Sequence, residues 1–249
     1  MGTRDGRPAV ARAILQQHVP DAVVTDISHA IEQNDLPRAA YLLQCTWRHY
    51  PIGTLHLLIT NALSVSRRMI LAFKDGHYFI APDNGILPTA LGPLAQVHMC
   101  GERAFTYREW LTLAARIATR IIADTWNKLP RTEPAAALQV QLPEPARDGI
   151  DCSVLYIDRF ENVVLNMTRE RFEQIIGERP FRIQLLGKKE ITAVSHQYTD
   201  ADTHTPLCRF NEAGYLEIAV NRGSAAAALA LDQQGNNKAL YYKTIRILF

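Results

Sequence analysis

Polar side chains that could bind or activate a small ligand occur at four places in the chain. His29 follows a β-branched run, and Arg67-Arg68 follows a polar loop. Asp83-Asn84-Gly85 follows an apolar run, and Asp158 with Asn162 follows another. Imidazole exchanges protons near neutral pH, guanidinium binds anions, and carboxylates and amides fix polar ligands by hydrogen bonds. Each of these residue types could serve a polar ligand, but taken one at a time they are weak signals of a site.

Each of these positions is also consistent with a purely structural role. His29 could be a hydrogen-bonded structural histidine, and Arg67-Arg68 could belong to a solvated surface. Asp83-Asn84-Gly85 could be only a turn, because Asn and Gly tolerate positive φ. Asp158 and Asn162 could make only local turn bonds. No metal-ligand spacing, phosphate loop or Ser-His-Asp order stands out, so we expect neither a metal nor a cofactor.

The elements that would position these residues alternate between helix and strand in the first half. Three helices are predicted from apolar spacing and four strands from β-branched or continuous apolar runs. The helices are expected at 8–18, 36–49 and 107–128, and the strands at 21–28, 55–60, 68–73 and 77–82. This alternation predicts an α/β domain over 1–130, a sandwich with a mostly parallel sheet.

The pattern changes after Leu129. Residues 130–149 contain four prolines and no helical period, so 131–150 is interpreted as a linker. Beyond it the chain is mostly strand-like, which predicts a smaller C-terminal β-barrel over 151–249. The predicted strands are 152–158, 162–168, 181–187, 190–198, 215–221 and 241–249, with one short helix at 169–177.

Composition excludes several classes of partner. The net charge is +2, from 27 basic and 25 acidic residues among 249, which argues against nucleic acid and anionic membrane surfaces. No run of 18 apolar residues and no signal segment is present, so a cytoplasmic location is expected. The four cysteines are far apart, without a Cys-x-x-Cys pair, and are expected to be buried thiols.

Five segments in one order resemble a known family. They are DISH at 26–29, YPIGTLH at 50–56, APDNGIL at 81–87, IDRFEN at 157–162 and GYLEIA at 214–219. This combination is similar to the S-adenosylmethionine hydroxide adenosyltransferase family, which also contains fluorinases and chlorinases. The resemblance implies an α/β domain, a β-barrel domain and a homotrimer, with an adenosyl ligand bound between the N-domain of one subunit and the C-domain of the next.

The resemblance also implies a reaction at the 5′ carbon of the ribose, where water, hydroxide or halide displaces methionine. The sulfonium is a good leaving group, so the main task is to present a small nucleophile in line with the C–S bond. In the hydroxide branch an Asp, an Arg and a His hold the water. Here Arg67 matches the Arg, but Thr60 occupies the Asp position and Thr106 the His position. Neither hydroxyl can act as a base near neutral pH.

The halogenase branch resembles this chain in having aromatic and hydroxyl residues before Arg-Glu, here Phe105, Thr106 and Tyr107. Tyr107 occupies the position of the halide-binding Ser. Its phenol would fill a pocket sized for one small ion, which argues against halogenation.

Other positions match the family's ligand-binding residues. Family members begin with a strand that ends in Asp-Phe-Gly and carries the ribose-binding Asp; here Met1 sits at the Phe position, so that strand is expected upstream of this chain or to be missing. Glu161 replaces a Gly and would be strained if that position needs positive φ. Glu212 would repel a carboxylate where the halogenases carry Ser. The resemblance implies ligand contacts at Asp5, Asp83, Asn84, Phe105, Tyr107, Asp158, Asn162, Asn221 and Arg222.

Three hypotheses remain open from the sequence. The first is an S-adenosylmethionine hydrolase that forms adenosine and methionine, with Arg67 placing the water. The second is a catalytically degenerate protein that binds S-adenosylmethionine or adenosine, because Thr60 and Thr106 replace two water-handling groups. The third is a structural remnant without a small ligand.

Overall fold

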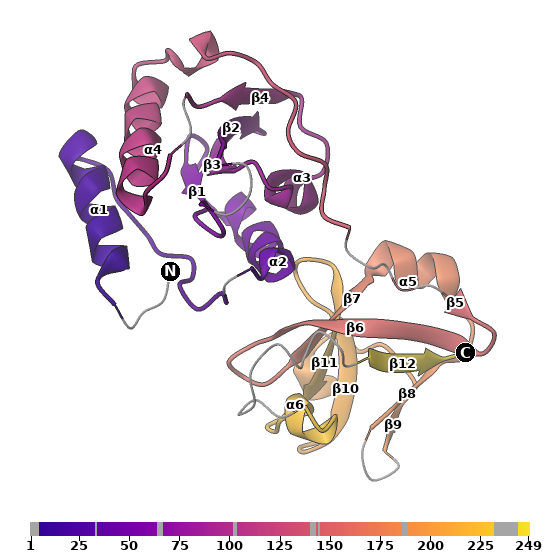
Figure 1. Ribbon diagram of the computed structural model, residues 1–249. Helices are drawn as coiled ribbons and strands as arrows, with labels where there is room; N and C mark the ends of the chain where they lie inside the picture. Colours follow the sequence, from indigo (N-terminus) through magenta and orange to yellow (C-terminus); the bar gives the residue numbers. More distant parts are fainter. Residues whose placement is uncertain are drawn as a thin grey trace. The chain divides into compact units, whose positions relative to one another are not determined.

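A computed structural model describes residues 5–32, 34–63, 67–101, 104–139, 143, 145–185, 189–231 and 244–249 (Figure 1). The chain forms two compact units, Met1–Gln139 and Val140–Phe249. Each unit has its own apolar core, so the two are described separately. In the described residues no helix is long and apolar enough to cross a membrane.

A four-stranded sheet forms the centre of the N-terminal unit, in the order β1-β3-β2-β4. β1 (Leu55–Leu57) pairs in parallel with β3 (His77–Pro82). β2 (Met69–Lys74) pairs antiparallel with β3 and with β4 (Gln96–Met99). The described sheet is therefore mixed. Asp75 and Gly76 form the turn between β2 and β3, and their φ values of 51° and 81° fit a tight hairpin. Such a hairpin joins only antiparallel strands.

Helices cover both faces of this sheet, as the sequence predicts for an α/β sandwich. On one face, α1 (Arg7–His18) and α4 (Tyr107–Ile122) pack against a cluster that includes Leu71. On the other, α2 (Leu36–Thr46) and α3 (Ile86–Leu91) pack against a cluster that includes Ile70 and Ala72. Neighbouring residues of β2 thus face opposite layers, because side chains alternate along a strand. Figure 1 shows the two helical layers on either side of the strands.

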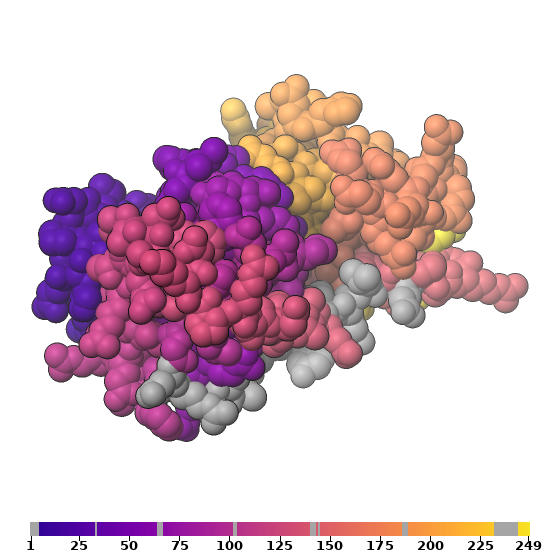
Figure 2. Space-filling view, turned by 90° about the horizontal axis from the view of Figure 1, so that it is seen from above, coloured from indigo at the N-terminus to yellow at the C-terminus, as the bar shows by residue number. Residues whose placement is uncertain are grey.

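The helix α1 forms part of the outer surface of this unit. In the space-filling view its indigo residues are exposed beside the magenta ones that belong to later parts of the same unit (Figure 2). Only Ala11 and Ile14 of the helix are buried. Most of α1 is therefore open to solvent, and its inner side anchors it to the core.

In the N-terminal unit, the strand predicted over 21–28 is wrong. Residues 21–28 are neither strand nor helix, and the side chains of Val23 and Ile27 are 93% and 41% exposed. The β-branched composition favours extended backbone, but a strand needs a neighbour for its hydrogen bonds, and this segment has no ladder partner among the described residues. The short helix α3 is not predicted by the sequence pattern, because Pro88 and the flanking turn obscure a helical period.

The C-terminal unit is a nearly closed antiparallel barrel, as predicted. Its sheet runs in the order β10-β11-β7-β6-β12-β8-β9, and β5 pairs with β6. A bridge between Val194 and Cys208 brings the chain beyond β9 against β10. The strands are β5 (Pro145–Ala146), β6 (Gly149–Ile157), β7 (Val163–Thr168), β8 (Arg182–Gln184), β9 (Glu190–Ile191), β10 (Pro206–Phe210), β11 (Tyr215–Val220) and β12 (Thr244–Leu248).

Helices in this unit are short. α5 (Arg169–Ile175) matches the predicted helix, and α6 (Ala225–Ala228) follows β11. The strand predicted over 190–198 is largely wrong: only β9 is strand, and η4 (Tyr198–Asp200) is a 3-10 turn held by a capping box between Gln197 and Asp200. The sequence pattern also misses β10. Parts of the predicted strands 181–187 and 241–249 lie outside the described residues.

Candidate functional site

The loop after β3 is tied to the chain that leaves the N-terminal unit. Asp83 is 6% exposed, and its carboxylate accepts a 2.7 Å hydrogen bond from the Ala135 amide and lies 3.4 Å from Nη1 of Arg68. Arg68 also donates to the Thr132 hydroxyl at 3.1 Å. Asp83 therefore positions the stretch after Pro130, and its carboxylate is not presented to solvent.

Asn84 and Gly85 shape the entrance to α3. Asn84 donates from Nδ2 to the Thr60 carbonyl at 3.2 Å and accepts from the Ile86 amide at 3.3 Å. Gly85 has a φ of 85°, and a Cβ there would lie 2.4 Å from the Ala136 carbonyl oxygen. Only glycine fits this close approach. Thr60 and Asn84, two predicted site residues, are thus brought together.

Arg67 and Phe105 form an exposed pair on the N-terminal unit. The Arg67 guanidinium carbon lies 5.0 Å from the centre of the Phe105 ring, and Phe105 is 63% exposed. Arg67 has a φ of 51°, a conformation that non-glycine residues adopt mainly where the surroundings require it. The Phe105 amide donates to Oε2 of Glu109 at 2.8 Å. The pair offers a cation and an aromatic face to a ligand.

Thr106 is engaged in starting α4. Its hydroxyl accepts from the Glu109 amide at 3.1 Å, while the Glu109 carboxylate accepts from the Thr106 amide at 3.2 Å. This reciprocal capping box satisfies two amides that the helix itself cannot pair. The residue at the family's His position therefore has a local structural function in this chain.

Tyr107, the next residue, packs inward. It contacts the core cluster that includes Ala11 and Ile14, and its hydroxyl is buried without a hydrogen-bond partner among the described residues. Burial raises the pKa of Tyr107 to about 12, so the phenol stays protonated.

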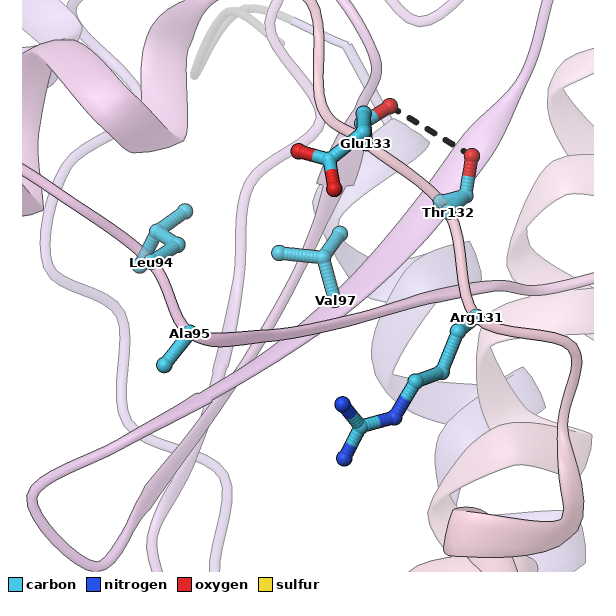
Figure 3. A pocket seen from close by; sticks show the side chains of 6 residues that line it. All are labelled: Leu94, Ala95, Val97, Arg131, Thr132 and Glu133. Carbon is cyan, nitrogen blue, oxygen red and sulfur yellow. Dashed lines mark hydrogen bonds between the residues drawn. The ribbon is translucent and has the colours of Figure 1, made fainter.

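A groove of about 270 Å³ lies beside β4, between Val97 and the side chains of Arg131 and Glu133 (Figure 3). The Thr132 hydroxyl between them donates to the Glu133 carbonyl at 3.4 Å. This groove contains none of the predicted site residues.

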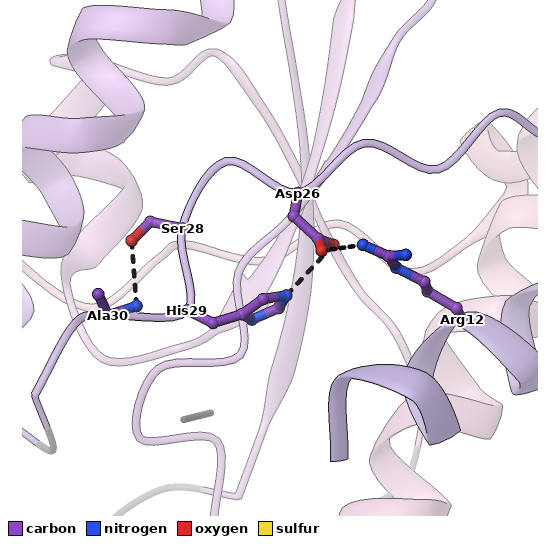
Figure 4. A network of polar contacts seen from close by, with 5 residues as sticks. All are labelled: Arg12, Asp26, Ser28, His29 and Ala30. Atoms are coloured by element: carbon purple, nitrogen blue, oxygen red, sulfur yellow. Dashed lines mark hydrogen bonds and ion pairs between the residues drawn. The ribbon is translucent and has the colours of Figure 1, made fainter. Parts of the chain in front are cut away.

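A second groove, of about 580 Å³, runs between α1 and residues 26–29. Asp26 lies at its wall, with one oxygen 3.2 Å from Nε2 of His29 and the other in contact with Arg12 (Figure 4). The Arg12 guanidinium holds the pKa of the Asp26 carboxyl below its usual range. Sequence reasoning does not single out Arg12 or Asp26 as site residues, although Asp26 belongs to the DISH segment. The groove is lined by Asp5, Pro8, Ala9, Arg12, Ala13, Gln16, Asp26 and His29.

Asp5 is the predicted ligand contact that lies in this second groove. Its carboxylate accepts from the Arg7 amide at 3.0 Å, and the residue is exposed. A second oxygen of the same carboxylate lies 3.5 Å from Nε of Arg7. The carboxylate is thus oriented by its neighbour and still open to solvent.

In the C-terminal unit, Asp158 and Asn162 form one rigid turn. Asp158 accepts from the amides of Phe160 and Asn162 at 2.8 Å each and from Nδ2 of Asn162 at 2.9 Å. Glu161 has a φ of 64°, so the strain expected at this former glycine position is present. The turn presents Phe160, which is 77% exposed. An exposed aromatic on a rigid turn is a candidate ligand contact that sequence reasoning did not single out.

The loop after β11 holds the remaining predicted residues. Asn221 donates from Nδ2 to the Ala201 carbonyl at 2.7 Å, so its side chain supports the neighbouring loop. Arg222 is exposed with a φ of 54°. A Cβ at Gly223 would lie 2.6 Å from Cγ1 of Val220, which explains glycine there. Glu212 is exposed in the turn between β10 and β11.

Cysteines and potential metal ligands do not gather into a site in the part of the chain that the structure describes. Cys100, Cys152 and Cys208 are buried free thiols, as predicted, and burial raises the pKa of each to about 12. Cys45 is only partly buried, which differs from the prediction. Within the described ranges no three His, Cys, Asp or Glu side chains are placed to hold a metal ion.

Comparisons with known proteins agree along most of the chain. Residues 1–119 match the SAM hydroxide adenosyltransferase N-terminal domain, and residues 152–236 match the corresponding C-terminal domain. A protein named (R)-S-adenosyl-L-methionine hydrolase from Salinispora arenicola is 28% identical over 92% of this chain and 91% of its own. One of the same name from Thermus thermophilus is 28% identical over 93% of each chain.

Solved structures share the fold. A crystal structure of an uncharacterized conserved protein from Thermotoga maritima covers 100% of this chain and 97% of its own, with a TM-score of 0.78 at 23% identity. A conserved hypothetical protein from Thermus thermophilus covers 99% of this chain and 95% of its own, with a TM-score of 0.70 at 25% identity. Because both domains are matched in order along one chain, the protein belongs to the SAM hydroxide adenosyltransferase family.

Proposed function

We propose that this protein hydrolyses S-adenosylmethionine to adenosine and methionine. The relatives named (R)-S-adenosyl-L-methionine hydrolase, which align over more than nine-tenths of the chain, support this reaction. The observation that carries it is the exposed Arg67 guanidinium over the Phe105 ring. It supplies a cation next to an apolar face, at the position that the resemblance assigns to holding the attacking water.

In this proposal Arg67 orients a water molecule toward the 5′ carbon of the ribose. The C–O bond forms as the C–S bond breaks, the electron pair of that bond stays on the methionine sulfur, and one proton of the water is released to solvent. The sulfonium carries a positive charge that is lost in the reaction, so an apolar wall such as Phe105 favours the transition state over the charged substrate. Asp5, Asp158 and Asn162 are proposed ligand contacts, together with Asn84, Tyr107, Asn221 and Arg222. Asp83 is proposed to act indirectly, by positioning the stretch of chain after Pro130.

The test is incubation of the full-length protein with S-adenosylmethionine, followed by chromatography for adenosine and methionine. Arg67→Ala is expected to lower kcat on the order of 100-fold, because the water loses its oriented cation. Arg116→Ala, an exposed arginine on α4, is the matched control and should keep the wild-type rate. Equal rates in Arg67→Ala and wild type would remove Arg67 from the mechanism.

A second candidate is a protein that binds S-adenosylmethionine or adenosine without turnover. The Thr106 hydroxyl favours this candidate, because it accepts a hydrogen bond in the α4 cap instead of holding a water molecule. Calorimetry with both ligands separates the two candidates: binding without adenosine formation supports the second. Halide attack is the least favoured alternative, and added chloride or fluoride should yield no 5′-halogenated nucleoside.

Three further properties belong to the same proposal and derive from the family resemblance or the composition. The chain is proposed to assemble as a homotrimer, to act in the cytoplasm and to need no cofactor besides its substrate. Dialysis against EDTA should leave the rate of adenosine formation unchanged. Cell fractionation tests the location.

A further inference from the structure

Arg68 is held at three points, directly beside the proposed water-orienting residue Arg67. Its Nη1 lies 3.4 Å from Oδ2 of Asp83, and its Nη2 donates to the Thr132 hydroxyl at 3.1 Å. Its carbonyl accepts from the Asp83 amide at 2.9 Å. The side chain of Asp83 is 3% exposed, so the acidic partner of the ion pair is buried. Both the backbone and the side chain of Arg68 are therefore fixed.

The Thr132 hydroxyl is a fixed acceptor for this guanidinium. The Thr132 amide donates to the Val97 carbonyl of β4 at 3.0 Å, which ties the backbone to the sheet. The hydroxyl itself donates to the Glu133 carbonyl at 3.4 Å (Figure 3). A hydroxyl has one hydrogen to donate and two lone pairs to accept with, so the bond to Glu133 leaves its oxygen oriented to accept from Arg68.

Arg67 needs such support, because its backbone has an uncommon conformation. Its φ is 51°, and non-glycine residues keep left-handed backbone mainly where the surroundings impose it. Arg67 is exposed, with its guanidinium carbon 5.0 Å from the centre of the Phe105 ring. The Phe105 backbone is fixed by its 2.8 Å hydrogen bond to Glu109. On the other side of the pair, the contacts of Arg68 act on the stretch of backbone that carries Arg67.

We propose that Arg68 is a positioning residue for Arg67, and that Asp83 and Thr132 act through it. This rests on the proposed hydrolysis, in which Arg67 orients the attacking water. The rotamers open to a side chain depend on the φ and ψ of its residue, so fixing the backbone at Arg68 sets the direction in which the Arg67 guanidinium extends. The donors of a guanidinium form a planar fork that bridges the Asp83 carboxylate and the Thr132 hydroxyl. The ammonium of lysine, on its flexible stem, does not reproduce that fork.

The experiment is a double-mutant cycle on kcat and KM for adenosine formation, with Thr132→Val, Arg67→Ala and the two combined. Thr132→Val keeps the shape of the side chain and removes the acceptor. It should lower kcat about tenfold with KM within about threefold, because the water-orienting group is misplaced. In the Arg67→Ala protein the same change should lower kcat less than about twofold, because the residue that it positions is absent.

Three further variants complete the comparison. Thr132→Ser keeps the hydroxyl and should retain the wild-type kcat. Arg68→Lys should resemble Thr132→Val, since it keeps the charge and loses the fork. The matched control is Thr119→Val on α4, where the hydroxyl donates to the Arg116 carbonyl of its own helix at 2.7 Å. This control should match the wild type.

The outcomes separate this proposal from the hydrolysis itself. If Thr132→Val lowers kcat by the same factor with and without Arg67, its effect is a general structural one, and the positioning role is rejected while the hydrolysis stands. Full activity of both Thr132→Val and Arg68→Lys has the same consequence. A wild type that forms no adenosine above the enzyme-free blank overturns both proposals. If Arg68→Lys unfolds at the assay temperature, the cycle with Thr132 decides, because it changes a single hydroxyl.

Discussion

At residue 161 a glutamate holds a backbone conformation that glycine adopts more readily, with a φ of 64°. Left-handed backbone costs a non-glycine residue about 1–3 kcal/mol, and Asp158 enforces it here by fixing the flanking amides. At Glu161 the backbone preference of a non-glycine residue is therefore overridden by the hydrogen bonds of the Asp158 turn.

Glu161→Gly is expected to stabilise the protein by about 1 kcal/mol, because it relieves that strain and glycine entropy offsets part of the gain. The same substitution at Glu173, inside α5, is the matched control and should destabilise by about 1 kcal/mol. Urea unfolding of both variants measures the two effects. Changes of equal sign would contradict this account of residue 161.

His56 makes the stability of the N-terminal unit depend on pH. Burial, and next the neighbouring His77, lower the pKa of His56 from 6.5 to about 4. The folded pKa lies below the unfolded one, so the stabilisation is complete above about pH 6.5 and is lost as pH falls toward 4. The loss should be on the order of 3 kcal/mol at full protonation.

The measurement is the free energy of unfolding at several pH values between about 7 and 4.5, the window in which the unfolded chain takes up the proton first. His56→Gln removes the titrating group, so its stability should fall less steeply over that window than that of the wild type. His49 is exposed on the turn η1 (Trp47–His49), and His49→Gln should keep the wild-type slope. If the free energy of unfolding of His56→Gln falls with pH as steeply as that of the wild type, other groups cause the acid sensitivity.

Among the elements, α4 has the clearest local signal for its first residue. Thr106 and Glu109 form a reciprocal cap, and the helix carries an apolar face that packs on the sheet through Trp110 and Leu111. The cap fixes the start of α4 and the backbone at Phe105, which contacts Arg67. Helix capping and site geometry are therefore coupled at this point.

Thr106→Ala should destabilise the protein by about 1 kcal/mol, while Thr106→Ser should be nearly neutral because it keeps the capping oxygen. Thermal or urea unfolding gives the difference between the variants. If both variants are as stable as the wild type, the hydroxyl does not contribute through the cap, and the water-holding role implied by the family resemblance regains support for Thr106.

At the scale of the whole molecule, two units with separate cores follow one another along the chain. Assembly as a homotrimer predicts a particle of three times 28.0 kDa in light scattering. A mass equal to one chain across the micromolar range would remove the trimer from the proposal.

The sequence by itself determined the α/β character before Pro130, apart from the strand expected at 21–28, and the strand-rich half after it. It also placed helices at 8–18, 107–128 and 169–177, which the structure has as Arg7–His18, Tyr107–Ile122 and Arg169–Ile175. Local apolar period and proline content carry that information, because they act over a few neighbouring residues. The strain at Glu161 was also predictable, since a turn motif that normally contains glycine fixes the sign of φ.

Only the tertiary structure decided which polar side chains are available to a ligand. Asp83 binds Arg68 and the Ala135 amide, and Thr106 is hydrogen-bonded to Glu109. Asp26 contacts Arg12 and His29. Partners such as Asp83 and Ala135 are distant in sequence, and their contacts depend on packing that no local pattern encodes. For the same reason residues 21–28, a strand by composition, remain unpaired among the described residues: a strand exists only where another offers hydrogen bonds.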